Sequence, residues 1–368
     1  MRIAVAVTND LVTDQRVARS CSALCEAGHS VTLIGRLLPE SQSLSRPYRI
    51  IRMRLIFRKK MWFYAEYNFR LFFKLLRLNP DMVYANDTDT LLASYCASRV
   101  LHCPLFFDAH EMFPEVPELV GRPWVKHFWE RIESCLIPRV DAAVTVCQSI
   151  ADSYRQRMGV NMSVVRNVPP FRPVQDVLPD SPPMLLYQGS VNLGRGIDWM
   201  IDAMEFLPDF RLVIAGIGDE FDLMRRYADD KPWSHRIEFL GRLTPEQLRN
   251  LTPKATLGLC LLDNLGLNYY YSLPNRIGDF IAAGVPLLAT DFPEIRRVIA
   301  AYGIGTLVSC QRGPALAQAV RQAVTSWNNL PQSERRERFR LAANDLCWEN
   351  DKNTLLAAVS KIIDKEKR

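Results

Sequence analysis

The sequence predicts an α/β protein with two Rossmann-like, doubly wound halves. Short apolar strands alternate with amphipathic helices in each half, which is the pattern of a mostly parallel sheet. The stretch 169–183 is proline-dense and aperiodic, and 368 residues, 48% of them hydrophobic, are enough for two cores. We therefore expect an N-terminal domain over 1–168, a linker over 169–183, a C-terminal domain over 184–346, and a final helix over 347–368 that can pack back on the N-terminal domain.

The first half begins with a strand in the run RIAVAV, which a polar loop follows. The next segment predicts a helix with Val17, Cys21 and Leu24 on one side, and Gly28 ends it. Further apolar runs predict the remaining strands of this half: SVTLIG, MVYAND, LFFDAH and AAVTV.

The second half repeats this alternation after the linker. The run MLLYQG predicts a strand, and the helix after it has four residues in phase, Ile197, Met200, Ile201 and Met204. Further strands are predicted in RLVIAG, IEFLG, TLGLCLL and VPLLAT. Two such halves joined by a linker predict a cleft between them, and clefts between domains are favoured ligand sites.

The segment 268–294, NYYYSLPNRIGDFIAAGVPLLATDFPE, is the most informative in the chain. It predicts a helix that begins near Pro274 and stops at Gly284, before a short buried strand. The apolar face of this helix consists of Leu273, Ile277, Phe280 and Ile281. Its polar residues suit the hydroxyls and phosphates of a nucleotide-sugar at the mouth of a sheet: Ser272, Asn275, Arg276 and Asp279.

Composition excludes several classes of protein. A formal charge of +6 is too small for this length to indicate nucleic-acid binding, and no DNA or RNA recognition motif is present. The N-terminus runs directly into a strand and no long apolar window exists, so we expect neither a signal peptide nor a membrane span. The nine scattered cysteines indicate reduced cytoplasmic thiols, and we expect no metal site.

A glycine-rich loop, SVNLGRG, follows the strand MLLYQG. Gly189, Gly194 and Gly196 allow tight turns, and Arg195 adds charge beside the amides that open the next helix. This pattern predicts either a diphosphate-binding loop or glycines that only allow the chain to turn. It lacks the Gly-Lys-Ser/Thr of a Walker A loop and is not a clean G-x-G-x-x-G, which disfavours a dinucleotide oxidoreductase.

Two more strand ends in the second half carry candidate residues. Gly216 and Gly218 follow RLVIAG, and Asp219 and Glu220 open the next helix, either near the nucleoside or only as partners of the helix dipole. Arg242 follows IEFLG and is either a phosphate ligand or a surface charge.

Polar residues also cluster after the strands of the first half. His110 follows LFFDA and could donate a hydrogen bond to the reacting sugar, or be a structural histidine held by Asp108. Asp14 could serve the same site or only cap a helix. The loop after the first strand and the end of a later strand supply the other candidates: Asn9, Asp10, Arg16, Asn86, Asp87, Asp89 and Glu111.

The segment 52–77 is basic and aromatic throughout. It predicts either an amphipathic helix that lies on an anionic bilayer or an ordinary helix with its aromatic residues in the core.

Taken in order, these elements resemble family 4 glycosyltransferases, which have the GT-B fold and are retaining, nucleotide-sugar-dependent enzymes. The resemblance spans nearly the whole chain, through ND…DQRV…ALCEAGHSVTLIG, DAHE, VTVCQSIAD…VVRNVP, YQGSVNLGRGIDWMIDAM, IAGIGD, FLGRLTPEQL and SLPNRIGDFIAAGVPLLATDFPE. It implies that Asp279 binds the donor ribose and that the basic pair for the diphosphate falls at Ser190 and Arg195. It also implies that His110 is the family histidine.

The sequence departs from the family pattern at the donor sugar. The first Glu of the common E-x7-E motif falls at Tyr271, and the second is shortened to Asp279. The identity of the donor therefore stays open.

From the resemblance we expect transfer of a glycosyl unit from a nucleotide-sugar to an acceptor hydroxyl, with retention and without metal. The C-terminal half would hold the donor, with Arg195 and the amides around Gly196 neutralising the diphosphate. The N-terminal half would bind a glycan or lipid-linked glycan acceptor in surface-polysaccharide assembly, at the inner face of the cell membrane, and domain closure would exclude water. Two alternatives stay open: a sugar-nucleotide epimerase of the same fold, and a weakly active nucleotide-sugar-binding scaffold in a polysaccharide assembly complex.

Overall fold

A computed structural model of the protein describes residues 1–12, 14–119, 121–174, 179–309 and 312–366. Part of the expected linker, residues 175–178, lies outside the described residues.

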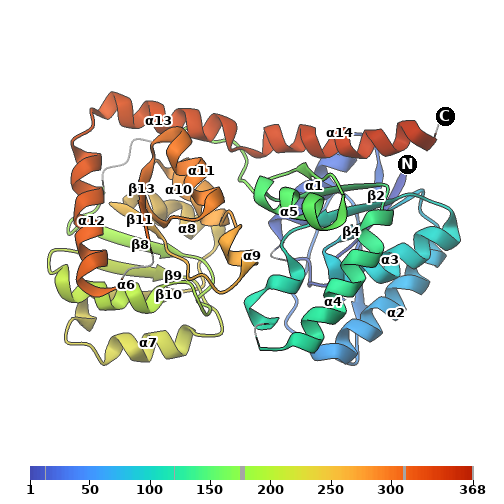
Figure 1. Ribbon diagram of the computed structural model, residues 1–368, viewed down its shortest axis with the longest axis horizontal. Helices are drawn as coiled ribbons and strands as arrows, with labels where there is room; N and C mark the ends of the chain where they lie inside the picture. Colours follow the sequence, from blue (N-terminus) through green and yellow to red (C-terminus); the bar gives the residue numbers. More distant parts are fainter. Residues whose placement is uncertain (13, 120, 175–178, 310–311, 367–368) are drawn as a thin grey trace. The chain divides into compact units, whose positions relative to one another are not determined.

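The chain forms two compact units (Figure 1). Unit 1 comprises Met1–Asn167 together with Asn350–Arg368, and unit 2 comprises Val168–Glu349. The final segment is joined to unit 1 by an ion pair between Arg166 and Asp351, with 3.0 Å between Nη2 and Oδ2. The C-terminal helix therefore completes the unit in which the chain begins.

In the part of the chain that the structure describes, unit 1 contains a seven-stranded parallel sheet in the order β3-β2-β1-β4-β5-β6-β7. The strands are β1 (Arg2–Ala6), β2 (Ser30–Leu37), β3 (Arg49–Arg54), β4 (Met82–Asn86), β5 (Leu105–Ala109), β6 (Ala142–Thr145) and β7 (Ser163–Val164). All residues of β4 and β5 are buried, as expected for central parallel strands covered on both faces.

The helices of unit 1 follow the predicted alternation. They are α1 (Gln15–Glu26), α2 (Lys60–Leu78), α3 (Thr88–Leu101), α4 (Pro123–Leu136), α5 (Gln148–Met158) and α14 (Trp348–Glu366). Val17, Cys21 and Leu24 of α1 are buried, so the predicted apolar side of this helix is confirmed. Figure 1 shows α2, α3 and α4 packed side by side.

The segment 52–77 is not one continuous helix, which corrects the sequence interpretation. Its first residues complete β3, a loop follows, and α2 begins only at Lys60. One face of α2 is buried through Phe63, Tyr67, Leu71 and Leu75, at a spacing of four residues. The expected packing of aromatic residues in the core holds for this face, whereas other aromatic residues of α2 are exposed. Association with an anionic bilayer stays a prediction.

Unit 2 contains, among its described residues, a six-stranded sheet in the order β10-β9-β8-β11-β12-β13, again parallel throughout. The strands are β8 (Met184–Gln188), β9 (Arg211–Ala215), β10 (Ile237–Gly241), β11 (Leu257–Cys260), β12 (Leu287–Thr290) and β13 (Gly305–Val308). The helices are α6 (Ile197–Ala203), α7 (Phe221–Asp229), α8 (Pro245–Leu251), α9 (Leu267–Tyr270), α10 (Asn275–Ala283), α11 (Pro293–Tyr302), α12 (Gly313–Asn328) and α13 (Gln332–Asp345).

Alternate residues of β8 contribute to two different cores. Met184 and Leu186 pack in a cluster with α10, α11 and α13, whereas Leu185 and Tyr187 pack in one with α6 and α12. Helices therefore cover both faces of the sheet, and the expectation of a doubly wound α/β architecture is confirmed.

The strand order fixes where ligands are expected in each unit. The winding reverses between β1 and β4 in unit 1 and between β8 and β11 in unit 2. Open α/β sheets bind ligands beyond the carboxyl ends of the strands at such switch points. None of the helices that the structure describes combines the length and apolar character needed to cross a bilayer.

Candidate active site

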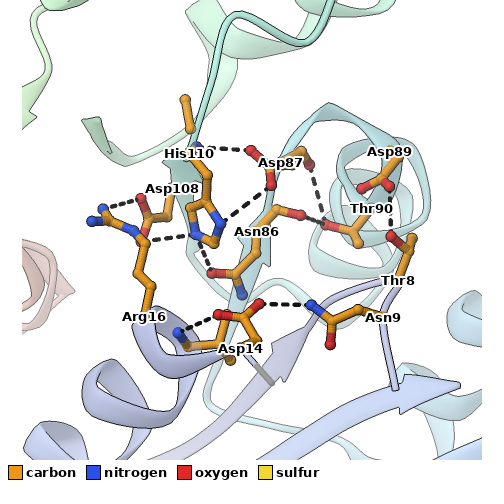
Figure 2. A network of polar contacts seen from close by, with 12 residues as sticks. Thr8, Asn9, Asp14, Arg16, Asn86, Asp87, Asp89, Thr90, Asp108 and His110 are labelled. Carbon is orange, nitrogen blue, oxygen red and sulfur yellow. Dashed lines mark hydrogen bonds and ion pairs between the residues drawn. The ribbon is translucent and has the colours of Figure 1, made fainter. Parts of the chain in front are cut away.

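Polar side chains gather at the switch point of unit 1, at the carboxyl ends of its central strands (Figure 2). Asn86 ends β4, and Asp108 pairs with it on β5. His110 follows β5, and Asp87 and Asp89 open α3. The strands that pair in register thus bring together residues that are separated in the sequence.

A buried ion pair supports this cluster. Arg16 Nη2 lies 2.6 Å from Asp108 Oδ1, with the two side chains 3% and 0% exposed. Arg16 also donates to the carbonyl of Val165, and the Tyr84 hydroxyl donates to Asp108 Oδ2. Burial alone would raise the pKa of Asp108, but the Arg16 guanidinium holds it well below its usual range. Asp108 is therefore ionised.

Arg16 was expected in the loop after the first strand, but it lies in α1. It is the second residue of α1, and its side chain points into unit 1, where Asp108 and a backbone carbonyl take up its donors. Asp14 caps α1 by accepting from Val17 N at 3.0 Å, and Asn9 donates to the other Asp14 oxygen at 2.6 Å. Through these contacts, Asn9, Asp14 and Arg16 stabilise the first loop and α1.

His110 has acceptors at both ring nitrogens. Nε2 lies 3.1 Å from Asn86 Oδ1 and 3.5 Å from Asp108 Oδ2. Nδ1 lies 3.3 Å from Asp87 Oδ2, and the His110 backbone N–H donates to the same carboxylate at 2.7 Å. Burial lowers the pKa of His110, but Asp87 and Asp108 outweigh it and raise the pKa to about 9. A doubly protonated ring, a donor at both nitrogens, is thus favoured at neutral pH.

The carboxylates that open α3 lie in a low-dielectric environment. Burial raises the pKa of Asp87, which the His110 imidazolium opposes. Burial also raises the pKa of Asp89 to about 7, against a 2.6 Å hydrogen bond from the Thr8 hydroxyl. Asp87 has φ +58°, an uncommon backbone conformation for a residue with a Cβ. Perturbed acids at a strained backbone position are typical of functional sites.

Glu133, on the buried face of α4, was not predicted from the sequence. Its Oε1 accepts from Thr88 at 2.7 Å and from the Tyr154 hydroxyl at 3.0 Å. Its Oε2 is buried without a hydrogen-bond partner, and burial raises its pKa to about 7. A Glu four residues after Trp129, on the apolar side of a helix, was the available sequence signal.

At the switch point of unit 2, glycines let two loops pack closely. Gly216 has φ +151°, and a Cβ there would lie 1.8 Å from the carbonyl oxygen of Gly189. A Cβ on Gly218 would lie 2.2 Å from Asn192 Oδ1. These glycines are therefore required by the approach of the loops after β8 and β9, and the loops are held by the bond from Gly189 N to the Ala215 carbonyl.

Two arginines at this edge stack on tyrosine rings. The Arg195 guanidinium lies 4.5 Å from the ring centre of Tyr269, and that of Arg276 lies 4.3 Å from the ring centre of Tyr187. Arg276 is only 7% exposed. Neither forms a salt bridge with any residue that the structure describes, and Arg276 Nη1 and Arg195 Nε are buried without a hydrogen-bond partner.

Arg195 and Arg276 both influence the pKa of one buried residue, Cys260. Burial raises the pKa of the Cys260 thiol, and Arg276 and Arg195 both oppose that rise. Two positive charges therefore lie near the end of β11, and among the described residues neither forms an ion pair with a carboxylate. Such an arrangement favours an anionic ligand, because an unpaired buried charge is costly.

Two family models match the chain in succession. The model described as Glycosyltransferase Family 4 matches residues 14–173, and the model described as Glycosyl transferases group 1 matches residues 171–345. The chain is a family 4 glycosyltransferase. The resemblance seen in the sequence is thereby confirmed, and the chain is an enzyme of the glycosyltransferase class.

Solved structures share the fold of this glycosyltransferase. A sucrose-phosphate synthase from Thermosynechococcus elongatus has a TM-score of 0.82 and 17% identity, over 99% of this chain and 100% of that chain. The lipopolysaccharide outer core galactosyltransferase WaaB has a TM-score of 0.71 and 15% identity, over 98% and 99%. Anabaena HepE in complex with UDP-glucose has a TM-score of 0.74 and 12% identity, over 98% and 100%. These likenesses establish the GT-B fold; a comparison with curated proteins gave no match.

The glycosyltransferase presents Asp279 on the exposed side of α10. Gln188 Nε2 donates to Asp279 Oδ2 at 3.4 Å, and the Thr252 hydroxyl fixes Gln188 from the other end. Asn275, one turn earlier, is also exposed, whereas Arg276 between them points inward. The polar side of α10 is therefore divided between an outward carboxylate and amide and an inward guanidinium.

Ser190 and Tyr271 occupy positions where the family resemblance implies charged residues. The Ser190 carbonyl accepts from the Tyr187 hydroxyl at 2.6 Å, which ties the loop to the ring that Arg276 covers. Tyr271 lies beside Tyr270, with ring centroids 5.3 Å apart. The guanidinium of Arg276 lies 3.4 Å from the position of a Cβ on Gly189. A cation from α10 is thus adjacent to the loop in which Ser190 replaces one.

The remaining donor-side candidates differ in exposure. The Ser272 hydroxyl donates to the Tyr269 carbonyl at 2.9 Å, and Leu273 packs against the core. Arg242 is exposed. Gly196, with φ +64°, precedes α6. Among described residues, no group of three or more His, Cys, Asp or Glu side chains is arranged to hold a metal ion.

Proposed function

We propose that the glycosyltransferase moves a sugar from a nucleotide-sugar to an acceptor hydroxyl with retention at the anomeric carbon. The bond between the anomeric carbon and the diphosphate oxygen breaks, and a bond to the acceptor oxygen forms on the same face. The acceptor proton leaves with the nucleoside diphosphate, so the reaction needs no redox partner.

The observation that carries this proposal is the pair of unneutralised arginines in unit 2. Arg195 and Arg276 lie at the switch point with no salt bridge to a described residue. The diphosphate gains negative charge as the sugar leaves, and fixed cations stabilise that charge by several kcal/mol in comparable sites. Two guanidinium groups and the amides at the start of α6 would do this without a metal ion.

The exposed side of α10 is suited to the nucleoside. Asp279 offers a carboxylate to the ribose hydroxyls, and Asn275 lies one turn away. The structure of HepE in complex with UDP-glucose supports a uridine nucleotide as the first donor to test. Tyr271, in place of the family Glu, leaves the sugar itself open.

Unit 1 would bind the acceptor. His110, with its pKa raised to about 9, lies at the carboxyl edge of the sheet, and a sugar hydroxyl bound there would share one of the ring N–H groups with Asn86 or Asp87. Asp87 and Asp89 beside it offer acceptors whose charge changes near neutral pH. We infer a glycan or lipid-linked glycan acceptor, in cell-surface polysaccharide synthesis on the inner face of the membrane. The exposed aromatic and basic residues of the segment 52–77 support association with an anionic bilayer.

A donor screen tests the proposal. The protein is titrated calorimetrically with UDP-, GDP-, ADP- and dTDP-linked sugars, with and without EDTA, and products are then identified by mass spectrometry and NMR. We expect saturable binding of one donor that EDTA does not weaken, and transfer with an unchanged anomeric configuration. The variant D279A should lose binding of the nucleoside diphosphate but retain binding of inorganic pyrophosphate.

Other outcomes identify the alternatives. An epimerised nucleotide-sugar formed without acceptor would indicate an epimerase. Binding without turnover across glycan acceptors would indicate a scaffold. No saturable heat with any nucleotide-sugar would remove the proposal.

A further inference from the structure

Unit 1 contains a cavity that is distinct from the polar cluster around His110. Its volume is about 460 Å³, and it lies where β2 and β3 end and the loop before α2 begins. Three arginines line it, Arg36, Arg54 and Arg58, with apolar side chains that include Leu55 and Phe57. No Asp or Glu is among the described residues of its wall.

The three charges of this arginine pocket are not neutralised by any carboxylate that the structure describes. None of the three arginines forms a salt bridge with a residue that the structure describes. Arg36 Nη1 donates to the carbonyl of Arg58 at 3.4 Å, and Arg36 Nε is buried with no hydrogen-bond partner. The Arg36 guanidinium lies 4.7 Å from the ring centre of Phe63, which holds it in place. Guanidinium groups gathered around one pocket are suited to phosphate oxygens.

The rim of the arginine pocket is apolar and strongly exposed. Ile56 is 75% exposed, Met61 70% and Trp62 61%, and the Trp62 ring lies 6.0 Å from that of Phe57 in the pocket wall. Large apolar side chains gathered beside cationic residues are typical of surfaces that enter the interface of an anionic bilayer.

The loop that carries Ile56 is fixed. The Glu66 carboxylate of α2 accepts from the backbone N–H groups of Ile56 and Phe57 at 2.8 to 3.1 Å. Arg70 pairs with the same carboxylate at 2.7 Å, so Glu66 adds little free negative charge. The loop therefore holds Ile56 outward.

The arginine pocket is joined to the first loop of unit 1, where acceptor residues were expected. Arg36 N donates to the Asn9 carbonyl at 2.9 Å, and the Ser41 hydroxyl in the pocket wall donates to Asp10 at 3.2 Å. A Cβ on Gly35 would lie 2.5 Å from Leu11, so this loop and β2 are in close contact. A ligand in the pocket would thus lie beside the acceptor side of the unit.

We propose that the arginine pocket binds the terminal phosphate of a membrane lipid while Ile56, Met61 and Trp62 enter the bilayer. This proposal rests on the membrane association in the proposed function. It deepens that function by assigning the association to one phosphate-selective pocket. A phosphomonoester presents three terminal oxygens to three guanidinium groups, whereas a phosphodiester presents two. The pocket should therefore prefer a lipid phosphomonoester over other anionic lipids.

Vesicle co-sedimentation of the full-length protein tests the proposal. Vesicles of phosphatidylcholine are prepared with equal mole fractions of phosphatidic acid or phosphatidylglycerol, or with neither. We expect wild-type protein to bind phosphatidic acid vesicles about tenfold more tightly than phosphatidylglycerol vesicles. This ratio corresponds to about 1.4 kcal/mol of binding free energy. The pocket variant R54Q/R58Q should lose this preference, and I56S/W62S should weaken binding to both anionic vesicles.

Matched variants separate the pocket from diffuse charge. K74Q/R77Q removes two cations of α2 that do not line the pocket, and it should lower binding to both anionic vesicles while keeping the preference. L223A removes an exposed apolar side chain of unit 2 and should change nothing. Because Arg54 and Arg58 are exposed, unfolding curves and nucleotide binding should stay as in wild type.

Three outcomes would overturn the proposal. If R54Q/R58Q and K74Q/R77Q have equal effects on both vesicles, diffuse charge explains binding, and the membrane association survives without the pocket. If inorganic phosphate competes fully with vesicles and I56S/W62S binds normally, the pocket serves a soluble phosphate. If wild type binds no vesicle, both the pocket and the membrane part of the proposed function fail, whereas the donor chemistry is untouched.

Discussion

The guanidinium of Arg276 lies 4.3 Å above the ring centre of Tyr187, and a Cβ on Gly189 would lie 3.4 Å from its Nη2. The helix α10 thus places a positive charge beside the loop after β8, which contains Ser190, where the family resemblance implies a basic residue.

The variant R276Q should bind nucleoside diphosphate at least about tenfold more weakly, since a charge-assisted contact to phosphate is worth roughly 1.5–3 kcal/mol. Calorimetric titration with UDP and with pyrophosphate measures the loss, and both ligands should be affected. The control R225Q removes an exposed arginine of α7 and should bind as wild type. Equal affinities for R276Q and wild type would show that Arg276 only supports the fold.

Replacing Arg16 should destabilise unit 1, because it leaves the Asp108 carboxylate buried without its cation. Breaking such a pair from one side costs about 3–5 kcal/mol. We expect that loss for R16M in chemical unfolding followed by circular dichroism. The matched variant R2M breaks the pair of Arg2 with Asp81, whose side chains are 58% and 38% exposed, and should unfold as wild type. A small effect of R16M would mean that water reaches Asp108.

The stability of unit 1 should depend on pH through Asp89. Its pKa in the folded state is raised from 3.8 to about 7, mainly by burial, so the folded state binds the proton more tightly than the unfolded state. Wild-type stability therefore falls as pH rises from about 4 to about 7. The variant D89N lacks this loss and can still accept from Thr8.

Thermal unfolding of D89N and wild type at pH 5 and pH 8 measures this dependence. The variant should gain in Tm at pH 8 and gain much less at pH 5. A gain of the same size at both pH values would assign the effect to packing and not to titration.

The loops after β8 and β9 should not tolerate a side chain at Gly216. A Cβ there would lie 1.8 Å from the Gly189 carbonyl oxygen, so G216A must displace the loop after β8. We expect lower stability and loss of nucleotide binding. Gly241 also has positive φ, +65°, but nothing lies within 4 Å of its Cβ position. G241A should therefore show only the backbone cost of about 1 kcal/mol and normal nucleotide affinity.

Elements with strong local signals could be predicted from the sequence. The helix around Asp279 follows from its proline and glycine boundaries and its apolar face, and Ile277, Phe280 and Ile281 are buried as expected. The glycine loops were located by position, because strand ends and turn residues are local features. Their tight mutual packing was not predictable, since it joins two loops from different βα units.

Residues whose role depends on distant partners were misjudged. Arg16 seemed to be a loop residue, but its partners Asp108 and Val165 lie 92 and 149 residues away. Glu133 meets Thr88, 45 residues away, and no local pattern indicates that contact. The end of β3 within the segment 52–77 was missed because its basic residues interrupt the apolar signal of a strand.

The polypeptide leaves unit 1 after Asn167 and re-enters it at Asn350, so unit 2 is an insertion with two covalent tethers. Leu355, Val359 and Ile362 of the returning segment are almost completely buried. Removing the last twenty or so amino acids would therefore expose the hydrophobic core of unit 1, which the N-terminal residues form. An autonomously folding fragment of this enzyme that contains unit 1 must therefore include both Met1–Asn167 and Asn350–Arg368.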